Sequence, residues 1–179
     1  VYYEPKTLAS REYFIENLKR GVAYAAAKEV MLAIETMDDP FLNSLSKIKT
    51  IKDEIPSPWL QAYPDLGNLS AWPENNVGRE LELGIANIVS VHLKDTQAVT
   101  AKSKGQFRDV PFGAGVVDFA GCLRTLKRLD YSGAFTIEMW TEKAADPIQE
   151  VKQAKDFFDP LFVQAGFVQE PVAKTNVPS

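Results

Sequence analysis

Four residues of this 179-residue sequence combine a side chain of a type that binds divalent cations with a position at or near the end of a short apolar run. They are Glu35 after VMLAI, Asp65 after WLQAYP, His92 within NIVSVHLKD, and Glu138 within AFTIEMW. An isolated carboxylate is costly to bury in such surroundings unless its pKa shifts until it is neutral. A cation held between three carboxylates and one imidazole removes that cost, and this oxygen-rich set suits Mn²⁺, Mg²⁺, Co²⁺ or Zn²⁺.

Each of the four residues also has a simpler interpretation when it is taken alone. A glutamate at a strand end, such as Glu35 or Glu138, is more often a surface or ion-paired residue. Asp65 follows a proline and precedes Leu-Gly-Asn, which is typical of a turn. His92 is the only histidine of the sequence, and a lone histidine in an apolar run is more often a core residue than a ligand. The recurrence of such residues at the same place in four successive units favours a metal site.

The elements that would position these residues alternate regularly along the chain. A helix is predicted at 10–28, with Ser10 as its N-cap. The proposed ligands belong to apolar runs of strand-like length, and the predicted strands are 30–35, 59–65, 87–95 and 134–140. A helical pattern follows each strand: one from Asp39-Pro40 through Ile55, one around 77–85, one at 118–129, and one that opens at Asp146-Pro147 and that Pro160 should end or kink.

The remaining segments are interpreted as loops, core or tail. Residues 94–109 are predicted to form a long polar loop, and a loop of this length inside a compact domain is often functional. No strand leads directly into GAGVVD at 113–118, so its glycines are interpreted as loop geometry that brings backbone near the site, not as a nucleotide fingerprint. Cys122 is predicted to lie in a helix core, and residues 169–179 to form a flexible tail.

Strands that are nearly continuous in apolar residues and alternate with helices indicate a parallel sheet covered by helices. Both an open doubly wound sheet and part of a (β/α)₈ barrel fit this pattern. A whole barrel takes roughly 250 residues, so this chain is too short to be one. In both architectures function gathers at the carboxyl ends of the strands, where the four candidate ligands are expected.

Composition excludes several other classes of protein. A net charge of −4 argues against a nucleic-acid surface, which needs a basic footprint. The single cysteine allows no disulfide within the chain, and it fits a cytoplasmic location. No apolar run approaches the length of a membrane-spanning helix, so no membrane partner is expected.

Five stretches of the sequence together resemble a known family. MLAIETMD, YPDLGNLSAW, VHLKDT, RDVPFGAGVVDF and TIEMW are similar to the L-ribulose-5-phosphate (L-xylulose-5-phosphate) 3-epimerases of the ascorbate-utilisation type, also called hexulose-6-phosphate isomerases. That family belongs to the sugar-epimerase and endonuclease-IV-like (β/α)₈ TIM barrels. The resemblance runs from Tyr2 to about Phe167. It implies that residues 1–168 are the C-terminal half of one barrel domain, with strands five to eight.

The resemblance also implies roles for individual residues. Glu35, Asp65, His92 and Glu138 would bind the metal, and Glu35 and Glu138 would also be the acid and base on opposite faces of the substrate. Asn68 stands where related free-ketose epimerases have a histidine that touches substrate oxygens, and Arg108 matches an arginine that binds sugar hydroxyls. The implied reaction epimerises a ketopentose phosphate through an enediolate. The implied partner is a small sugar phosphate, and the family's enzymes allow for a homodimer.

Other functions remain open at this stage. The same fold could serve an isomerase of hexulose phosphates, or an isomerase or epimerase of free ketoses. A phosphodiesterase related to endonuclease IV would be expected to carry more histidines and a basic face, and one histidine with a net charge of −4 counts against it. A truncated fragment without activity is the last alternative, because family members carry four more strands before the region matched here.

Overall fold

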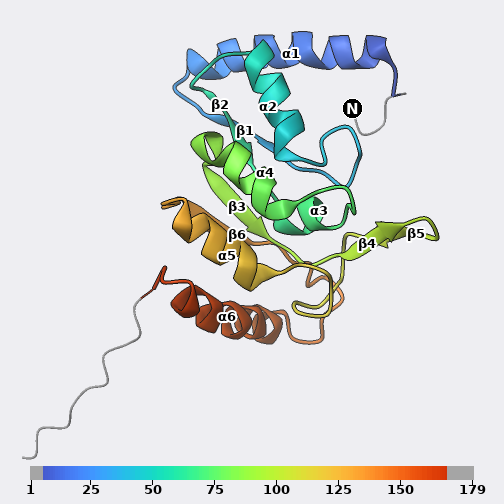
Figure 1. Cartoon of the computed structure of the whole chain (residues 1–179), viewed down its shortest axis with the longest axis vertical. Helices are drawn as coiled ribbons and strands as arrows, with labels where there is room; N and C mark the ends of the chain where they lie inside the picture. Colours follow the sequence, from blue (N-terminus) through green and yellow to red (C-terminus); the bar gives the residue numbers. More distant parts are fainter. Residues whose placement is uncertain (1–5, 169–179) are drawn as a thin grey trace, which may run out of the picture.

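The computed structural model describes residues 6–168, and four parallel strands form its centre. Strands β1 (Leu32–Glu35) and β2 (Leu60–Tyr63) pair in parallel, as do β3 (Ser90–Leu93) and β6 (Ala134–Ile137). Parallel bridges from Ala62 to Ile88 and from Asp65 to His92 join the two pairs. The strands therefore run in the order β1, β2, β3, β6, with all their carboxyl ends on one side (Figure 1).

One long helix precedes the first of these strands, and a helix follows each of the four. They are α1 (Leu8–Ala26), α2 (Leu45–Glu54), α4 (Val77–Gly84), α5 (Phe119–Arg128) and α6 (Pro147–Gln164). The helices α2, α4, α5 and α6 contact their neighbours in that order, while α1 lies at one end of the molecule and α6 at the other (Figure 1). This arrangement is four consecutive strand-and-helix units, which confirms the predicted parallel sheet covered by helices.

The core lies between the sheet and these helices. Its fully buried side chains are mainly leucine, isoleucine and valine, including Leu45, Ile48, Leu60, Leu81 and Leu126. Each such side chain contributes roughly 1.5–3 kcal/mol by leaving water. Cys122 is buried among them, and burial raises the pKa of its thiol to about 12, so the predicted core role is confirmed. None of the helices within residues 6–168 is long and apolar enough to cross a membrane.

The helix starts are set by side-chain caps, and two of them differ from the prediction. Helix α1 begins at Leu8, and its N-cap is Thr7; Ser10 is instead the third helical residue, which closes a capping box with Thr7. Helix α2 begins at Leu45 after the cap Ser44, not at Asp39-Pro40. The carboxylate of Asp39 accepts the backbone N–H of Phe41 in a separate turn, so it caps no helix.

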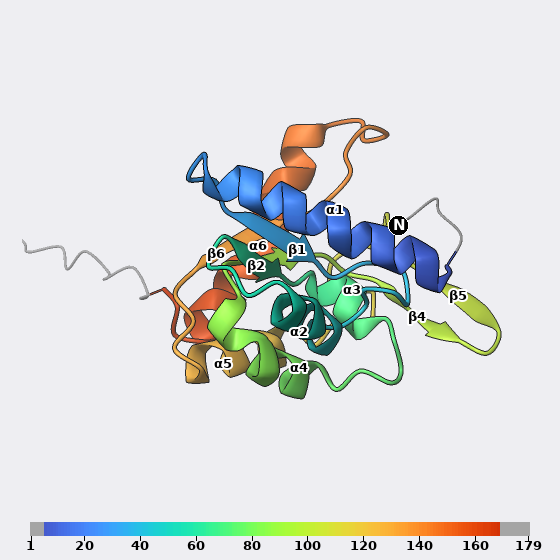
Figure 2. The same cartoon turned by 90° about the horizontal axis from the view of Figure 1, so that it is seen from above.

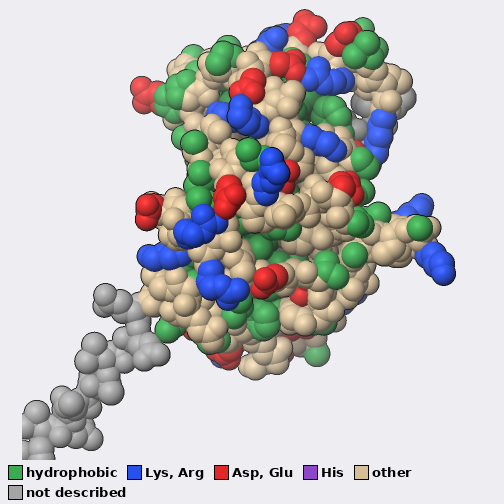
Figure 3. Space-filling view, in the orientation of Figure 1, with side chains coloured by type: hydrophobic (Ala, Val, Ile, Leu, Met, Phe, Trp, Pro, Cys, Tyr) green, Lys and Arg blue, Asp and Glu red, His purple; other side chains and the backbone are tan. Residues whose placement is uncertain are grey.

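Three further elements differ from the prediction. The segment 94–109 is not a plain loop, because it contains the antiparallel hairpin of β4 (Gln97–Thr100) and β5 (Ser103–Gln106), which projects from the body (Figure 2). Its residues are mostly exposed, and basic side chains gather at its tip (Figure 3). A five-residue helix, α3 (Leu66–Ser70), follows β2 directly.

Pro160 was expected to end or kink the last helix, and the expectation that it ends the helix is wrong. Helix α6 continues through Pro160 to Gln164. Proline removes one backbone hydrogen bond from a helix. Packing on both sides of it outweighs that loss, because Phe158 is fully buried and Phe162 contacts Phe135 and Phe158. The predicted tail at 169–179 lies outside the described residues.

Candidate metal centre

The four predicted ligands meet at the carboxyl ends of the four strands. Glu35 is the last residue of β1, Asp65 follows β2, His92 is in β3, and Glu138 directly follows β6. One ligand atom from each lies within 4.8 Å of the others, and we call these four residues the strand-end cluster. Two backbone hydrogen bonds fix this register: the His92 N–H donates to Pro64 O at 2.9 Å, and the Glu138 N–H donates to Leu93 O at 3.0 Å.

His92 lies among the carboxylates and not in the apolar core. Its Nδ1 is 2.8 Å from Glu35 Oε1, 3.2 Å from Glu138 Oε2 and 3.9 Å from Asp65 Oδ2. Burial lowers the pKa of the imidazole, but the hydrogen bond to Glu35 and the surrounding negative charges outweigh burial and raise it. The Tyr63 ring packs against the imidazole with ring centroids 4.1 Å apart, which restricts its orientation.

Asp65 caps a helix and also lies in the strand-end cluster. Its Oδ1 accepts the Asn68 N–H at 2.7 Å and caps α3, while its Oδ2 faces the strand-end cluster. The backbone N–H of Asp65 donates to the buried Thr36 hydroxyl at 2.9 Å, which fixes the turn. The Asp65 side chain is fully buried; this burial raises the pKa of the carboxyl to about 7, although the nearby Lys94 ammonium opposes the shift.

Two buried oxygens of the cluster could bind a cation. Within the described part of the chain, Asp65 Oδ2 and Glu138 Oε2 accept no hydrogen bond, and they face Lys94 Nζ at 3.0 Å and His92 Nδ1 at 3.2 Å, respectively. Buried polar atoms without a hydrogen bond are uncommon in folded proteins. Three carboxylates and one imidazole, whose ligand atoms lie within 4.8 Å of one another, form a set that suits a divalent cation. The residues present therefore fit such a cation.

Lys94 is a fifth charged residue of the site; it lies where the predicted strand 87–95 and the predicted loop 94–109 overlap, and the sequence assigned it no role of its own. Its side chain is 8% exposed, and its Nζ lies 3.0 Å from Asp65 Oδ2 and 3.5 Å from Glu138 Oε1. Side chains two residues apart on a strand point to the same face, so the spacing from His92 to Lys94 could have placed both in the site. Its ammonium also lies over the Trp140 ring, 5.5 Å from the centroid.

The two predicted substrate-binding residues lie at different distances from the cluster. Asn68 is buried on α3 beside Asp65, where its side-chain amide donates to Thr36 O at 2.8 Å. Its Oδ1 is buried and accepts no hydrogen bond among the described residues. Arg108 is exposed; its guanidinium lies 4.4 Å from the Trp140 ring centroid and 3.4 Å from a Glu142 oxygen. Arg108 thus lies at the rim of the site, where it contacts the same Trp140 ring as Lys94.

Asp95 holds the glycine-rich segment after the hairpin in place. Its buried carboxylate accepts the N–H groups of Gly113, Gly115 and Val117 at 2.8, 3.0 and 3.3 Å. A Cβ on Gly115 would lie only 2.0 Å from Asp95 Oδ1, so no larger residue fits without a shift. The glycines therefore serve loop geometry, as the sequence predicted.

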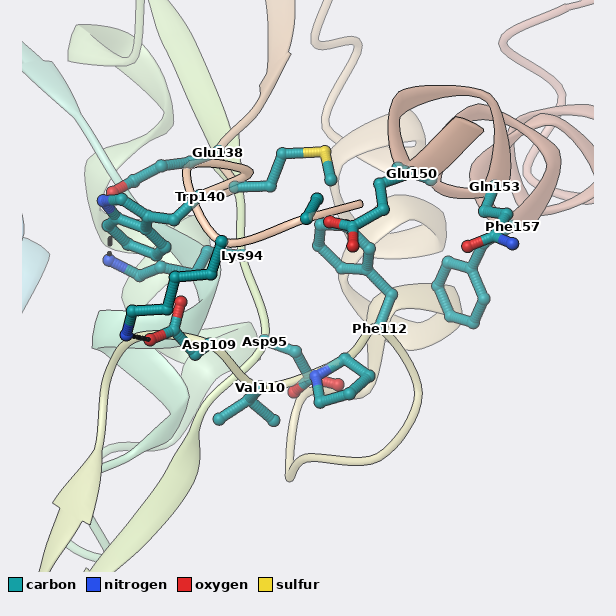
Figure 4. A pocket seen from close by; sticks show the side chains of 15 residues that line it. Lys94, Asp95, Asp109, Val110, Phe112, Glu138, Trp140, Glu150, Gln153 and Phe157 are labelled. Carbon is teal, nitrogen blue, oxygen red and sulfur yellow. Dashed lines mark hydrogen bonds and ion pairs between the residues drawn. The ribbon is translucent and has the colours of Figure 1, made fainter. Parts of the chain in front are cut away.

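A cavity of about 700 Å³ adjoins the strand-end cluster (Figure 4). Lys94, Glu138 and Trp140 line the end next to the cluster, and Phe112 and Phe157 lie farther along it. The cavity has both apolar and charged lining residues, and a concave space of this size beside a cluster of titratable groups is typical of a small-molecule site.

Known proteins resemble the chain in both sequence and fold. SgbU of Escherichia coli (strain K12), provisionally named an L-ribulose-5-phosphate 3-epimerase, is 53% identical over 94% of this chain and 58% of its own length. The L-ribulose-5-phosphate 3-epimerase UlaE of Shigella boydii is 46% identical over 94% of this chain and 57% of its own length. The chain therefore spans somewhat over half the length of these relatives.

Solved structures agree on the fold. An L-ribulose 3-epimerase superposes with a TM-score of 0.74 at 17% identity, covering 98% of this chain and 61% of that one. The IOLI protein, crystallised with a zinc atom, gives a TM-score of 0.71 at 16% identity over 90% of this chain and 60% of that one. Residues 1–161 match the family described as the xylose isomerase-like TIM barrel. The chain belongs to the xylose isomerase-like TIM barrel family, and its four strand-and-helix units are part of such a barrel.

Proposed function

We propose that this chain is the C-terminal, metal-binding part of a sugar-phosphate 3-epimerase that interconverts L-ribulose 5-phosphate and L-xylulose 5-phosphate. The names of the relatives at 46–53% identity support the substrate class. The single observation that carries the chemistry is the strand-end cluster, with its two buried oxygens that accept no hydrogen bond among the described residues. A resident cation fits those oxygens, and IOLI, of similar fold, was crystallised with zinc.

The exposure of the three carboxylate side chains distinguishes Asp65, proposed only as a ligand, from Glu35 and Glu138, proposed also as acid and base. The Asp65 side chain is fully buried, whereas those of Glu35 and Glu138 are 40% and 26% exposed. Only Glu35 and Glu138 can therefore reach a sugar carbon as well as a cation. They come from β1 and β6, the outermost of the four strands, so they approach the site from two sides. Removing a proton from one face and returning it to the other requires two such groups.

A bound divalent cation would supply positive charge for the enediolate that develops when the proton next to the ketone is removed. Glu35 would hold a proton on one face of that carbon and Glu138 on the other. The hydrogen bond between His92 and Glu35 orients this carboxylate. We assign Asn68 to substrate oxygens because its buried Oδ1 accepts no hydrogen bond among the described residues, and Arg108 to sugar hydroxyls at the rim.

A free ketose is the second candidate substrate. More carboxylates than lysines line the cavity: Asp95, Asp109, Glu138 and Glu150 against Lys94 and Lys143. This balance favours an uncharged sugar over a phosphate within that cavity. We infer a cytoplasmic enzyme of small-molecule metabolism that uses Mn²⁺, Mg²⁺, Co²⁺ or Zn²⁺ and forms a homodimer. Because the chain spans somewhat over half of its relatives, the rest of the pocket wall would come from a segment equivalent to their remaining length.

Turnover of L-ribulose 5-phosphate in the presence of Mn²⁺ tests this proposal. Glu138→Gln should lower the turnover by at least about a hundredfold, because it removes one proton-transfer group. Glu142→Gln, which changes an exposed glutamate paired with Arg108, is a matched control for carboxylate loss in the same loop. Equal rates for Glu138→Gln and the parent would remove Glu138 from the mechanism, and faster turnover of free L-ribulose would favour the second substrate.

A further inference from the structure

Lys94 is a buried cation placed between two residues of the strand-end cluster. Its Nζ lies 3.0 Å from Asp65 Oδ2 and 3.5 Å from Glu138 Oε1. His92 Nδ1 lies closest to the remaining carboxylate, 2.8 Å from Glu35 Oε1. Glu138 lies between the two basic side chains, because its Oε2 is also 3.2 Å from His92 Nδ1, whereas Asp65 Oδ2 is closer to Lys94 than to His92.

The surroundings of Lys94 hold its ammonium inside the site. Its side chain is 8% exposed, and the Trp140 ring lies over the ammonium with its centroid 5.5 Å away. The charge is therefore balanced by the cluster and the ring, with little access to water. A buried charge without a partner is strongly destabilising, and Lys94 has two such partners, so loss of either Asp65 or Glu138 leaves the other carboxylate beside the ammonium.

With a divalent cation bound, the net charge of the site is zero only if Lys94 is included. The carboxylates of Glu35, Asp65 and Glu138 sum to −3 when ionised, and His92 is neutral when it binds a metal. A divalent cation leaves this set at −1, and the Lys94 ammonium brings it to zero. A trivalent cation would balance the carboxylates without Lys94, and with Lys94 it would leave a buried excess of +1.

We propose that Lys94 is a specificity-determining residue that keeps the loaded site neutral and so selects a divalent over a trivalent cation. This inference rests on the proposed metal site and goes beyond it, because Lys94 acts through the charge of the cluster and binds no metal itself. A role limited to supporting the fold would change stability and leave the relative affinity for the two kinds of cation unaltered.

The test measures Mn²⁺ and Tb³⁺ binding separately on the metal-free chain. Mn²⁺ affinity is read from the electron paramagnetic resonance of free Mn²⁺. Tb³⁺ affinity is read from terbium luminescence sensitised by aromatic side chains near the site, such as Tyr63, whose ring lies 4.1 Å from that of His92. The quantity compared between variants is the ratio of Tb³⁺ to Mn²⁺ association constants.

Four variants separate charge from packing. Lys94→Met removes the charge and keeps the length of the side chain. Lys94→Gln also removes the charge but keeps a hydrogen-bond donor, and it serves if the methionine variant does not fold. Lys94→Arg keeps the charge. Lys143→Met is the matched control, because Lys143 lines the same cavity but is 85% exposed and pairs with Asp109 at 3.8 Å.

Removing one unit of charge this close to the cation should raise the Tb³⁺ to Mn²⁺ ratio about tenfold or more in Lys94→Met and Lys94→Gln. The ratio should stay within about threefold of the parent in Lys94→Arg and Lys143→Met. An unchanged ratio in the uncharged variants, or loss of both metals from them, overturns the role of Lys94. A parent chain that binds neither cation instead overturns the metal site itself.

Discussion

The strand-end cluster and the aromatic cluster lie on either side of one cavity, and they contribute to the protein in opposite ways. The aromatic cluster consists of Phe112, Phe119, Phe157 and Phe158, whose rings pack edge to face at centroid distances such as 4.9 and 5.0 Å. The strand-end cluster gathers three carboxylates whose mutual repulsion and burial oppose folding. The aromatic cluster, which stabilises the fold, and the strand-end cluster, which opposes folding, thus lie in different parts of one cavity.

Phe158→Ala should have the largest effect on stability. Phe158 is 1% exposed and contacts Phe112, Phe119 and Phe157, so truncation leaves a cavity that costs about 3–5 kcal/mol of unfolding free energy. Urea denaturation measures this loss. Mn²⁺ affinity of the folded protein should stay within about threefold of the parent. A large fall in Mn²⁺ affinity with little loss of stability would show that the two clusters are not separate.

Asp65→Asn should reverse that pattern. It removes a metal ligand, so Mn²⁺ affinity should fall by at least about a hundredfold. The folded pKa of Asp65, about 7, lies above its unfolded value of 3.8, so its contribution to stability is fully present below the unfolded value and is lost progressively as pH rises from there through about 7. The metal-free variant should therefore be more stable than the parent at pH 8.5, by on the order of a few kcal/mol, and by clearly less at pH 5.

Thermal denaturation of both metal-free proteins at the two pH values checks this sign. Asn68→Asp is not a suitable control because it adds a charge to the cluster, whereas Asp53→Asn changes an exposed aspartate paired with Lys49 on α2. Asp53→Asn should leave both Mn²⁺ affinity and stability nearly unchanged. A destabilised Asp65→Asn at pH 8.5 would mean that helix capping outweighs the burial of the charge.

The pH dependence of Mn²⁺ affinity is a smaller effect from the same residues. Metal binding requires an ionised Asp65, whose pKa burial raises to about 7, and a neutral His92, whose pKa is also raised. Affinity should therefore increase about tenfold or more between pH 6 and pH 8. Calorimetric titration in several buffers measures both the affinity and the protons released. Binding that is independent of pH, with no proton release, would contradict these shifted values.

The sequence predicted that the four residues of the strand-end cluster lie together, because they follow one simple rule. Apolar runs end in chemistry-bearing residues, and parallel strands bring their carboxyl ends together, so Glu35, Asp65, His92 and Glu138 could be placed without a structure. No separate role was predicted for Lys94, which directly follows β3 and lies where the predicted strand 87–95 and the predicted loop 94–109 overlap. Its burial follows from the pairing of β3 with β6 and from Trp140, which is distant in sequence.

The errors in the fold have a common physical origin. The hairpin β4–β5 is mostly exposed, so its sequence lacks the alternation of apolar residues by which strands are recognised. Helix α6 passes Pro160 because packing around Phe158 and Phe162 compensates for the lost hydrogen bond. In both cases the residue pattern of the segment alone does not determine its structure.

Mn²⁺ binding to the metal-free parent and to His92→Ala, measured by calorimetry together with thermal denaturation, tests the strand-end cluster most directly. We predict one Mn²⁺ per parent chain, at least about a hundredfold weaker binding in His92→Ala, and only a mild change in the stability of the metal-free protein. Unchanged Mn²⁺ binding in His92→Ala with a large loss of stability would contradict the account and make His92 a core residue.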